Sequence, residues 1–282
     1  FCYSVLKNSK MKIQYQSKEL ILFESALFRT TTSLIVGEDY VLLIDPNWLP
    51  IELDFIEETI ELIGAGKEKY LLFTHSDYDH IIGYGQFKHY KTIASENFVN
   101  NSSKDAILKQ IEDFDDGFYI KRKYKIEYPS IDQVISGEKE SLMLGSEEYF
   151  FFQARGHNSD GLLIYNSTKG ILIAGDYLSN IEFPYIYDSV HHYLDTLSTL
   201  EKIIHETKIS QFISGHGDFT SDQGEMLIRI KEARLYIYEL IESVKLNIVF
   251  NEKELLEKYD FPIIMKQFHL KNVELAEREF NV

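Results

Sequence analysis

Two histidines and two aspartates occur within six positions of this chain, in the run Thr74-His75-Ser76-Asp77-Tyr78-Asp79-His80. The run directly follows Tyr70-Leu71-Leu72-Phe73, a short apolar stretch that predicts a buried strand. Hydrophobic packing does not require two imidazoles and two carboxylates on one turn, where they repel one another and lose solvation. A bound cation offsets both costs, so the run predicts a metal site at the end of a strand.

Three later segments have a related form, in which a ligand-type residue stands beside glycine after a strand-like stretch. They are Gly156-His157-Asn158, Ala174-Gly175-Asp176 and Ser214-Gly215-His216-Gly217-Asp218. Glycine lets the backbone turn sharply and approach a site closely, and active sites are commonly assembled from loops at strand ends. The four segments offer seven ligands with one carboxylate shared, about what two four-coordinate metals need when a water fills the remaining position.

The order of apolar segments predicts the fold class. Short strand-like stretches between Leu20 and Ile44, with a turn at 37–39, indicate an antiparallel meander, and apolar residues at helical spacing follow and stop at Gly64. A second strand series, from Ser141 to Ala174, repeats this pattern before a helix at about 193–205. Two strand-rich halves that each end in helices predict two sheets packed face to face with helices outside, an α/β sandwich.

We expect three regions along the chain. Residues 1–12 form an N-terminal extension, because Met11 directly precedes the first strand-like stretch at 13–15. Residues 13–220 form the catalytic domain, in which the polar, partly periodic segment 95–140 is inserted or elaborated. Residues 221–282 form a helical C-terminal part packed on the same domain, because apolar residues recur at helical spacing from Ile230 to Val244.

Composition narrows the classes of partner. The formal net charge is −16, so the chain lacks the excess of basic side chains that is typical of nucleic-acid-binding proteins. This favours a small-molecule substrate. The only cysteine is Cys2, so no intrachain disulfide can form. No apolar run approaches the roughly 20 residues of a membrane span. A cytoplasmic protein with no membrane partner is therefore expected.

The four segments, in this order, resemble the metallo-β-lactamase superfamily over roughly residues 20–220. That family has a His-x-His-x-Asp-His motif, then a single His, a bridging Asp and a last His, and its Gly-His-Gly-x-x-Thr ending is similar to residues 215–220 here. The resemblance implies a four-layer αββα sandwich, here with a helical C-terminal extension. It also implies one metal held by His75, Asp77, His157 and Asp176, and a second held by Asp79, His80, Asp176 and His216.

Position 77 departs from the family pattern, because it holds Asp where most members have His. The extra carboxylate lowers the positive charge of a dinuclear centre, and this should favour harder ions. We therefore expect two divalent ions, with zinc as the default and iron or manganese as alternatives. The flavodiiron branch of the superfamily resembles the sequence at this position.

The resemblance implies a metal-dependent hydrolase in which a hydroxide bridging the two ions attacks a small ester, thioester, lactone or phosphoester. Asp176 argues against antibiotic hydrolysis, since many β-lactamases of this fold have Cys there or lack the bridging Asp. We assign catalytic roles to Asp79, which orients or deprotonates the attacking water, and to Tyr193 as a hydrogen-bond donor. Tyr78 and Tyr177 are alternative donors, and Asp45 is expected to support the metal loop without binding metal.

Two other functions remain open from the sequence. A di-iron oxidoreductase of flavodiiron type fits Asp77, but no flavin-binding domain is visible after residue 220, so a separate electron donor would be required. A metal-dependent sensor or binding protein would keep the ligands without turnover. The remaining histidines lie outside the four segments and are assigned no metal role; they are His89, His191, His192, His205 and His269.

Overall fold

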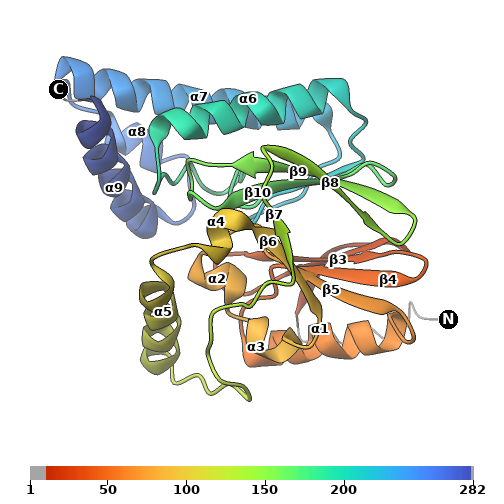
Figure 1. Ribbon diagram of the computed structural model, residues 1–282. Helices are drawn as coiled ribbons and strands as arrows, with labels where there is room; N and C mark the ends of the chain where they lie inside the picture. The colour runs from red at the N-terminus through yellow and green to blue at the C-terminus, as the bar shows by residue number, and fades with distance from the viewer. Residues whose placement is uncertain (1–10, 281–282) are drawn as a thin grey trace. The chain divides into compact units, whose positions relative to one another are not determined.

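The computed structural model describes residues 11–280. The chain divides into two compact units that meet between Phe151 and Phe152, and Figure 1 labels their elements. The part of the expected N-terminal extension at residues 1–10 lies outside the described residues. Met11 is buried, and the first strand begins at Lys12. None of the helices within 11–280 combines the length and apolar character that crossing a membrane requires.

The first unit contains the first sheet, the helices between its strands, and β8, a strand of the second sheet. Its elements are β1 (Lys12–Gln16), β2 (Leu20–Glu24), β3 (Thr31–Val36), β4 (Tyr40–Ile44), α1 (Pro50–Ile63), β5 (Glu68–Leu72), α2 (Tyr78–Ile81), α3 (Tyr84–Phe87), β6 (Lys91–Ser95), α4 (Glu96–Val99), α5 (Lys104–Gly117), β7 (Gln133–Ile135) and β8 (Lys139–Leu144).

The first sheet has seven strands in the order β1 to β7. Strands β1 to β4 pair antiparallel, as the sequence predicts for the meander, and β4 to β7 pair parallel. Helix α1 covers one face of this sheet (Figure 1) and buries Leu53, Ile56 and Ile60 in a core with Leu43 and Leu71 of the strands. Parallel strands end at the same edge, so this pairing directs the loops after β4 and β5 to one edge of the sheet.

Local sequence explains where α1 begins and ends. Pro50 occupies the first turn, where its missing N–H costs nothing. The Glu52 carboxylate accepts hydrogen bonds from the backbone N–H of Leu49 at 3.0 Å and of Ala26 at 2.9 Å. The helix stops before Gly64, as the sequence predicts.

The segment at 95–140 is built into the first unit. It supplies α4, α5 and the edge strand β7, whose Gln133 to Ile135 pair parallel with Ile93 to Ser95 of β6. Helix α5 buries only Ile107 and Ile111. This accounts for its polar, weakly periodic sequence.

The second unit holds the remaining elements. They are β9 (Glu147–Ala154), within which the division of the units falls, β10 (Gly161–Asn166), β11 (Ile171–Ile173), α6 (Val190–Glu206), β12 (Gln211–Ile213), α7 (Gln223–Leu246), α8 (Glu252–Leu256) and α9 (Pro262–Phe280). The second sheet has the order β12-β11-β10-β9-β8, with β11 and β12 parallel. Helices α6 and α7 run side by side in Figure 1.

The two sheets and their helices confirm the expected α/β class with a helical C-terminal part. In the second unit, the apolar face predicted for the last long helix is buried at Ile230, Ala233, Ile237 and Leu240 of α7. The three metal-type segments of this unit follow β9, β11 and β12. Strands β11 and β12 are parallel neighbours, so the segments after them leave the same edge of the sheet.

Candidate metal centre

In the first unit, the ligand-type residues lie on the connection between β5 and α2. Asp77 occupies the position before the first turn of α2, and Asp79 and His80 lie within that short helix. The chain passes directly from a buried strand into this turn, so the side chains are held by backbone on both sides. His75 and His80 are buried, with 2% and 0% of their surfaces exposed.

Asp45 organises this connection from the end of β4. Its Oδ1 accepts a hydrogen bond from the backbone N–H of Thr74 at 2.9 Å, and its Oδ2 accepts one from Thr74 Oγ1 at 2.5 Å. The same Oδ2 lies 2.9 Å from Nδ1 of His80. Asp45, His75 and His80 could also group around an ion, but these contacts fit a carboxylate that orients the loop, as the sequence suggested.

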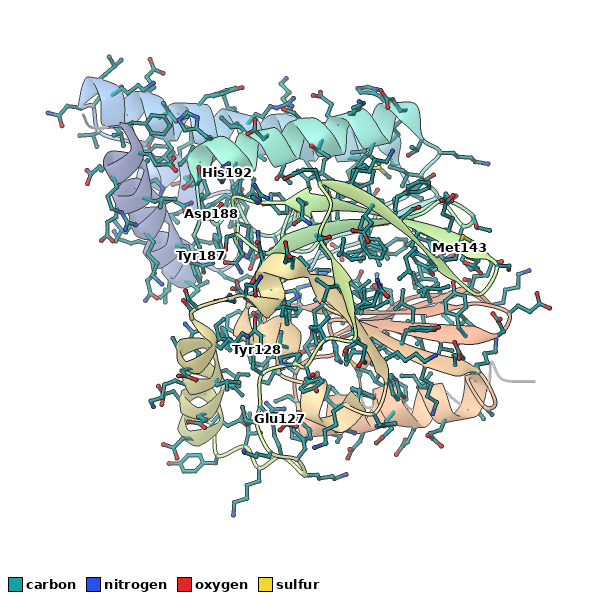
Figure 2. The ribbon with its side chains drawn as sticks, in the orientation of Figure 1. Glu127, Tyr128, Met143, Tyr187, Asp188 and His192 are labelled. Carbon is teal, nitrogen blue, oxygen red and sulfur yellow. The ribbon has the colours of Figure 1, made fainter. Side chains whose placement is uncertain are left out.

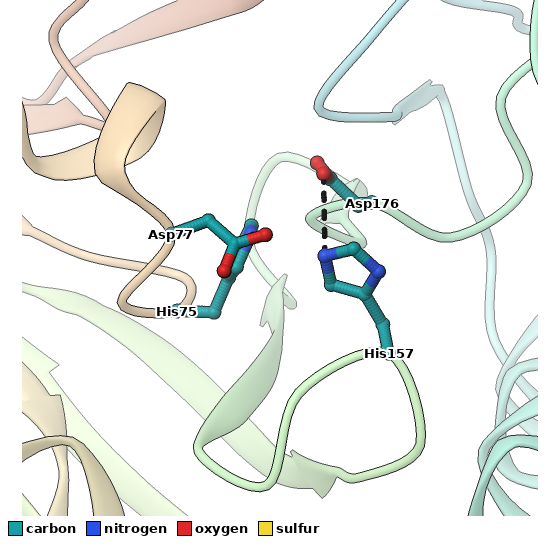
Figure 3. Close-up of side chains that lie close together, drawn as sticks. All are labelled: His75, Asp77, His157 and Asp176. Carbon is teal, nitrogen blue, oxygen red and sulfur yellow. Dashed lines mark ion pairs between the residues drawn. The ribbon is translucent and has the colours of Figure 1, made fainter. Parts of the chain in front are cut away.

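The first-unit imidazoles direct their Nε2 atoms toward the carboxylates of the same turn. His75 Nδ1 lies 2.9 Å from Thr74 Oγ1, while its Nε2 lies 3.7 Å from Oδ2 of Asp77. His80 Nε2 lies 3.6 Å from Oδ2 of Asp79. The side chains of His75 and Asp77 are drawn in Figure 3. With Nδ1 engaged, Nε2 is the nitrogen available to a metal.

In the second unit, one carboxylate oxygen lies close to two imidazoles. Oδ2 of Asp176 is 3.4 Å from Nε2 of His157, an ion pair dashed in Figure 3. The same oxygen is 3.3 Å from Nε2 of His216. Asp176 and His216 follow the paired parallel strands β11 and β12, and His157 follows β9, which β10 separates from β11 in the sheet. A single oxygen in this position can bind the same ion as either imidazole or as both.

A close backbone approach fixes the His157 loop. Gly156 has φ +120°, and a Cβ there would lie 2.3 Å from the backbone nitrogen of Tyr193 at the start of α6. Glycine is therefore required at this position. His157 Nδ1 lies 2.9 Å from the carbonyl oxygen of Tyr185, which orients the ring and again leaves Nε2 for a metal.

The distances within each unit fit ligands of a common ion better than direct hydrogen bonds. Two ligand atoms, each about 2.0–2.1 Å from a tetrahedral ion, lie roughly 3.3–3.4 Å apart. The two contacts of Asp176, at 3.4 and 3.3 Å, match this separation, and those of His75 and His80, at 3.7 and 3.6 Å, are slightly longer. Buried imidazole and carboxylate donors of this kind suit zinc, iron or manganese.

A family comparison agrees with this geometry. The model of the metallo-β-lactamase superfamily matches residues 26–208. The chain belongs to the metallo-β-lactamase superfamily. No curated protein matches its sequence.

Solved structures share the fold at low sequence identity. A sec-alkylsulfatase, Pisa1 from Pseudomonas sp., is 13% identical with a TM-score of 0.68, over 96% of this chain and 50% of that one. A metallo-β-lactamase from Pontibacter korlensis is 13% identical (TM-score 0.57; 80% and 99% covered). The DIM-1 metallo-β-lactamase is 16% identical (TM-score 0.56; 80% and 97% covered). The chain thus spans about half the length of the sulfatase.

The three tyrosines considered from the sequence have different environments in this superfamily member. Tyr78 packs edge-on against Trp48, with ring centroids 5.4 Å apart. The hydroxyl of Tyr177 accepts from the backbone N–H of His157 at 2.9 Å and donates to the carbonyl of Arg155 at 2.8 Å, so it holds the ligand loop. Tyr193 lines a cavity together with Asp176. Burial raises the pKa of Tyr193 well above its usual value, so its hydroxyl remains a neutral donor.

Three of the remaining histidines contact residues other than the seven ligand-type residues. His192 forms an ion pair with Asp188 at 2.9 Å, both labelled in Figure 2, and His191 packs against Phe280. The adjacent imidazoles thus have different partners, in agreement with the expectation that they share no ion. His269 is buried beside Tyr236, with 3.1 Å between Nδ1 and the hydroxyl.

Arg229 of α7 was missed by the sequence analysis. Its Nη1 donates to the carbonyl of Leu178 at 3.2 Å and to that of Asp218 at 3.0 Å. These residues stand two positions after Asp176 and His216, so one guanidinium ties together two ligand loops of the second unit. The available signal was a charged residue within an apolar helical face, since Arg229 lies between Met226 and Ile230.

Proposed function

We propose that this chain is a metal-dependent hydrolase acting on a small ester, thioester, lactone or phosphoester. Seven residues would hold two divalent ions: His75, Asp77, Asp79, His80, His157, Asp176 and His216. Membership of the superfamily supports hydrolysis in general terms, and the chemistry of these donors supports a metal.

The observation that carries the proposal is the position of the Asp176 carboxylate. One of its oxygens lies at ligand-to-ligand distance from His157 and from His216. A carboxylate shared in this way suits a centre with two ions.

The chain's own groups would position substrate and water. Two divalent ions, when bound, would polarise the oxygen under attack and lower the pKa of water. Asp79 would orient the attacking water or accept its proton. The neutral hydroxyl of Tyr193 would donate a hydrogen bond to the developing negative charge or to the leaving group.

Charge and burial favour a small substrate. The formal net charge of −16 opposes binding of nucleic acids, whose phosphates require basic side chains. The ligand-type residues are mostly buried, with His157 2% exposed and His216 6% exposed. A substrate must therefore reach into the protein with a narrow reacting group.

The proposal is tested by metal content and by hydrolysis on the same preparation. Mass spectrometry of protein purified without added metal should give about two ions per chain. The loaded protein should hydrolyse at least one member of a panel of esters, thioesters, lactones, phosphodiesters and an alkyl sulfate, the last being the substrate class named for the sulfatase. Asp176→Asn should lose both metal and activity. Loss of neither would reject the proposal.

A di-iron oxidoreductase is the second candidate, because of Asp77. Its Oδ2 lies 3.7 Å from Nε2 of His75, so a carboxylate occupies a ligand-type position where zinc hydrolases of this superfamily mostly have imidazole. If iron is the native metal, wild-type protein should contain two irons and consume oxygen with a reductant. Asp77→His should exchange that iron for zinc. Zinc in both proteins would reject the di-iron oxidoreductase.

A further inference from the structure

A second cavity of the second unit lies among its last three helices. Helix α9 packs against both α7 and α8 (Figure 1), and the cavity has a volume of about 380 Å³. This volume is within the range of roughly 300–1,000 Å³ that is typical of small-molecule sites. The described residues that line it include none of the seven ligand-type residues. It is therefore a site apart from the proposed metal centre.

Much of the cavity wall is apolar. Val244 lies near the end of α7, Ile248 and Phe250 lie on the segment before α8, and Leu270 and Val273 belong to α9. Ile248 and Leu270 are 54% and 50% exposed, so the cavity is open to solvent beside these two side chains. A ligand with an alkyl chain would remove this apolar surface from water.

A chain of hydrogen bonds leads to His269, the imidazole in this wall. The backbone N–H of Ile186 donates to Oδ1 of Asn272 at 3.0 Å, which fixes the orientation of this amide. Nδ2 of Asn272 donates to the carbonyl of Pro184 at 2.6 Å and to the hydroxyl of Tyr236 at 2.8 Å. Both hydrogens of the amide nitrogen are thereby used, and the oxygen of Tyr236 is an acceptor.

The hydroxyl of Tyr236 determines which nitrogen of His269 carries the proton. Burial raises the pKa of Tyr236, so the phenol is protonated. Since its oxygen accepts from Asn272, its own hydrogen is directed to Nδ1 of His269, 3.1 Å away. Burial lowers the pKa of His269, so the imidazole is neutral at pH 7. A neutral imidazole that accepts at Nδ1 carries its hydrogen on Nε2.

The Nε2–H group of His269 has no acceptor within residues 11–280. Nε2 is not among the fully enclosed polar atoms of these residues, so it belongs to the 3% of the His269 surface that is exposed. Nδ1 is directed to Tyr236 and His269 lines the cavity, so the exposed Nε2 faces the cavity. A nearly buried N–H of this kind favours a ligand that brings an acceptor.

The charges around the cavity disfavour an anion as that acceptor. Glu252 is half-buried in the wall and accepts from Nζ of Lys266 at 3.0 Å, so this pair is neutral overall. Glu277 is exposed in the wall, and no cation of the described residues pairs with it. The wall therefore keeps one uncompensated negative charge, which repels a carboxylate. A carbonyl oxygen is neutral and only accepts, so it suits this N–H best.

We propose that this cavity binds a neutral carbonyl compound with an alkyl chain, such as a ketone, an amide or an ester. The carbonyl oxygen accepts from Nε2–H of His269, and the alkyl chain packs against Phe250, Leu270 and Val273. The inference goes beyond the proposed hydrolase and does not depend on it, because the cavity and the ligand-type residues are separate.

Titration of the full chain with 2-hexanone, followed by NMR of the His269 nitrogens, tests binding. We expect a protonated Nε2 and an unprotonated Nδ1 in the free protein, and 2-hexanone should shift the Nε2 resonance. 2-Methyl-1-hexene, in which CH₂ replaces the carbonyl oxygen, should bind at least about fivefold more weakly. Hexanoate should also bind at least about fivefold more weakly, because Glu277 repels it. Equal binding of the ketone and the alkene, or of the ketone and hexanoate, would overturn the inference.

A substitution that fills the cavity tests its location. Val273→Trp should weaken 2-hexanone binding at least about tenfold, because the indole would occupy the space of the ligand. Ile263→Trp is the matched control, since Ile263 lies on the same helix, is 81% exposed and is outside the cavity wall. It should bind 2-hexanone as the wild type does. Wild-type affinity in Val273→Trp would reject this cavity as the binding site.

Removal of metal separates this site from the proposed metal centre, because a ketone oxygen can also bind a metal ion. The affinity for 2-hexanone should be the same in zinc-loaded protein, in chelator-treated protein and in Asp176→Asn. A ketone is not hydrolysed, so this result is independent of whether the protein is a hydrolase. Binding that disappeared with the metal would place the ketone at the metal centre and refute the cavity site.

Discussion

Oδ2 of Asp45 lies 2.9 Å from Nδ1 of His80, and the other oxygen of that carboxylate accepts the backbone N–H of Thr74. A residue at the end of β4 thus sets both the path of the loop after β5 and the orientation of an imidazole. Groups that orient a metal ligand in this way affect metal affinity without touching the ion.

Asp45→Asn should weaken metal binding by about 10–100-fold, because the charge that orients His80 is lost. Competition with a chromophoric chelator measures this change. Asp132→Asn is a matched control, since Asp132 also accepts from the backbone N–H and hydroxyl of a threonine, Thr92, but contacts none of the proposed ligands. Metal affinity that falls equally in both variants would point to general destabilisation instead.

Tyr193→Phe should reduce kcat by about 10²-fold, the usual effect of removing one donor to a developing negative charge. Metal content should remain that of the wild type, because the hydroxyl is not among the proposed ligands. Tyr165→Phe, which removes a hydroxyl that donates to the carbonyl of Lys208, should leave kcat unchanged. Steady-state kinetics on the best substrate of the panel measures kcat for both variants. An unchanged kcat in Tyr193→Phe would remove this tyrosine from the mechanism.

Arg229→Met should destabilise the second unit by about 3 kcal/mol, since two buried carbonyls lose charged donors worth roughly 1.5–3 kcal/mol each. Metal affinity should fall as well, because those carbonyls belong to the loops that carry Asp176 and His216. Urea unfolding and chelator competition provide the two measurements.

Arg234→Met is the matched control for this prediction. Arg234 lies on the same helix and forms a partly exposed ion pair with Glu201 at 2.7 Å, so its loss should cost less than about 1 kcal/mol. If both variants were equally destabilised, the special role of Arg229 would be refuted.

The sequence predicted the elements whose patterns are local. The meander from Leu20 to Ile44 and the end of α1 at Gly64 follow from alternation, helical spacing and a breaker residue, and the structure has both. The ligand-type residues were recognisable because each stands beside a strand end, and four such segments occur in a fixed order.

Other features depend on contacts between residues distant in sequence. Nothing near Arg229 indicates that its guanidinium reaches the carbonyls of Leu178 and Asp218, because a backbone carbonyl has no sequence signature. The roles of Tyr177 and Tyr193 could not be separated either. Only the fold shows that the hydroxyl of Tyr177 holds the His157 loop and that Tyr193 lines a cavity.

A pH effect on stability is expected from His269, which is buried in α9 beside Tyr236 and Phe250. Burial lowers the pKa of His269, while Glu252 raises it and Lys266 lowers it. The unfolded chain therefore takes up this proton at a higher pH than the folded protein does. Stability from this group is fully present above pH about 6.5 and falls as the pH drops from there toward the folded pKa.

His269→Asn should flatten this part of the stability profile, because the variant has no imidazole to protonate on unfolding. Urea unfolding at pH 5, 6, 7 and 8 gives the slope for each protein. His205→Asn, at an exposed position near the end of α6, should keep the wild-type slope. If His269→Asn also kept it, the loss of stability in acid would have to arise from groups other than this buried imidazole.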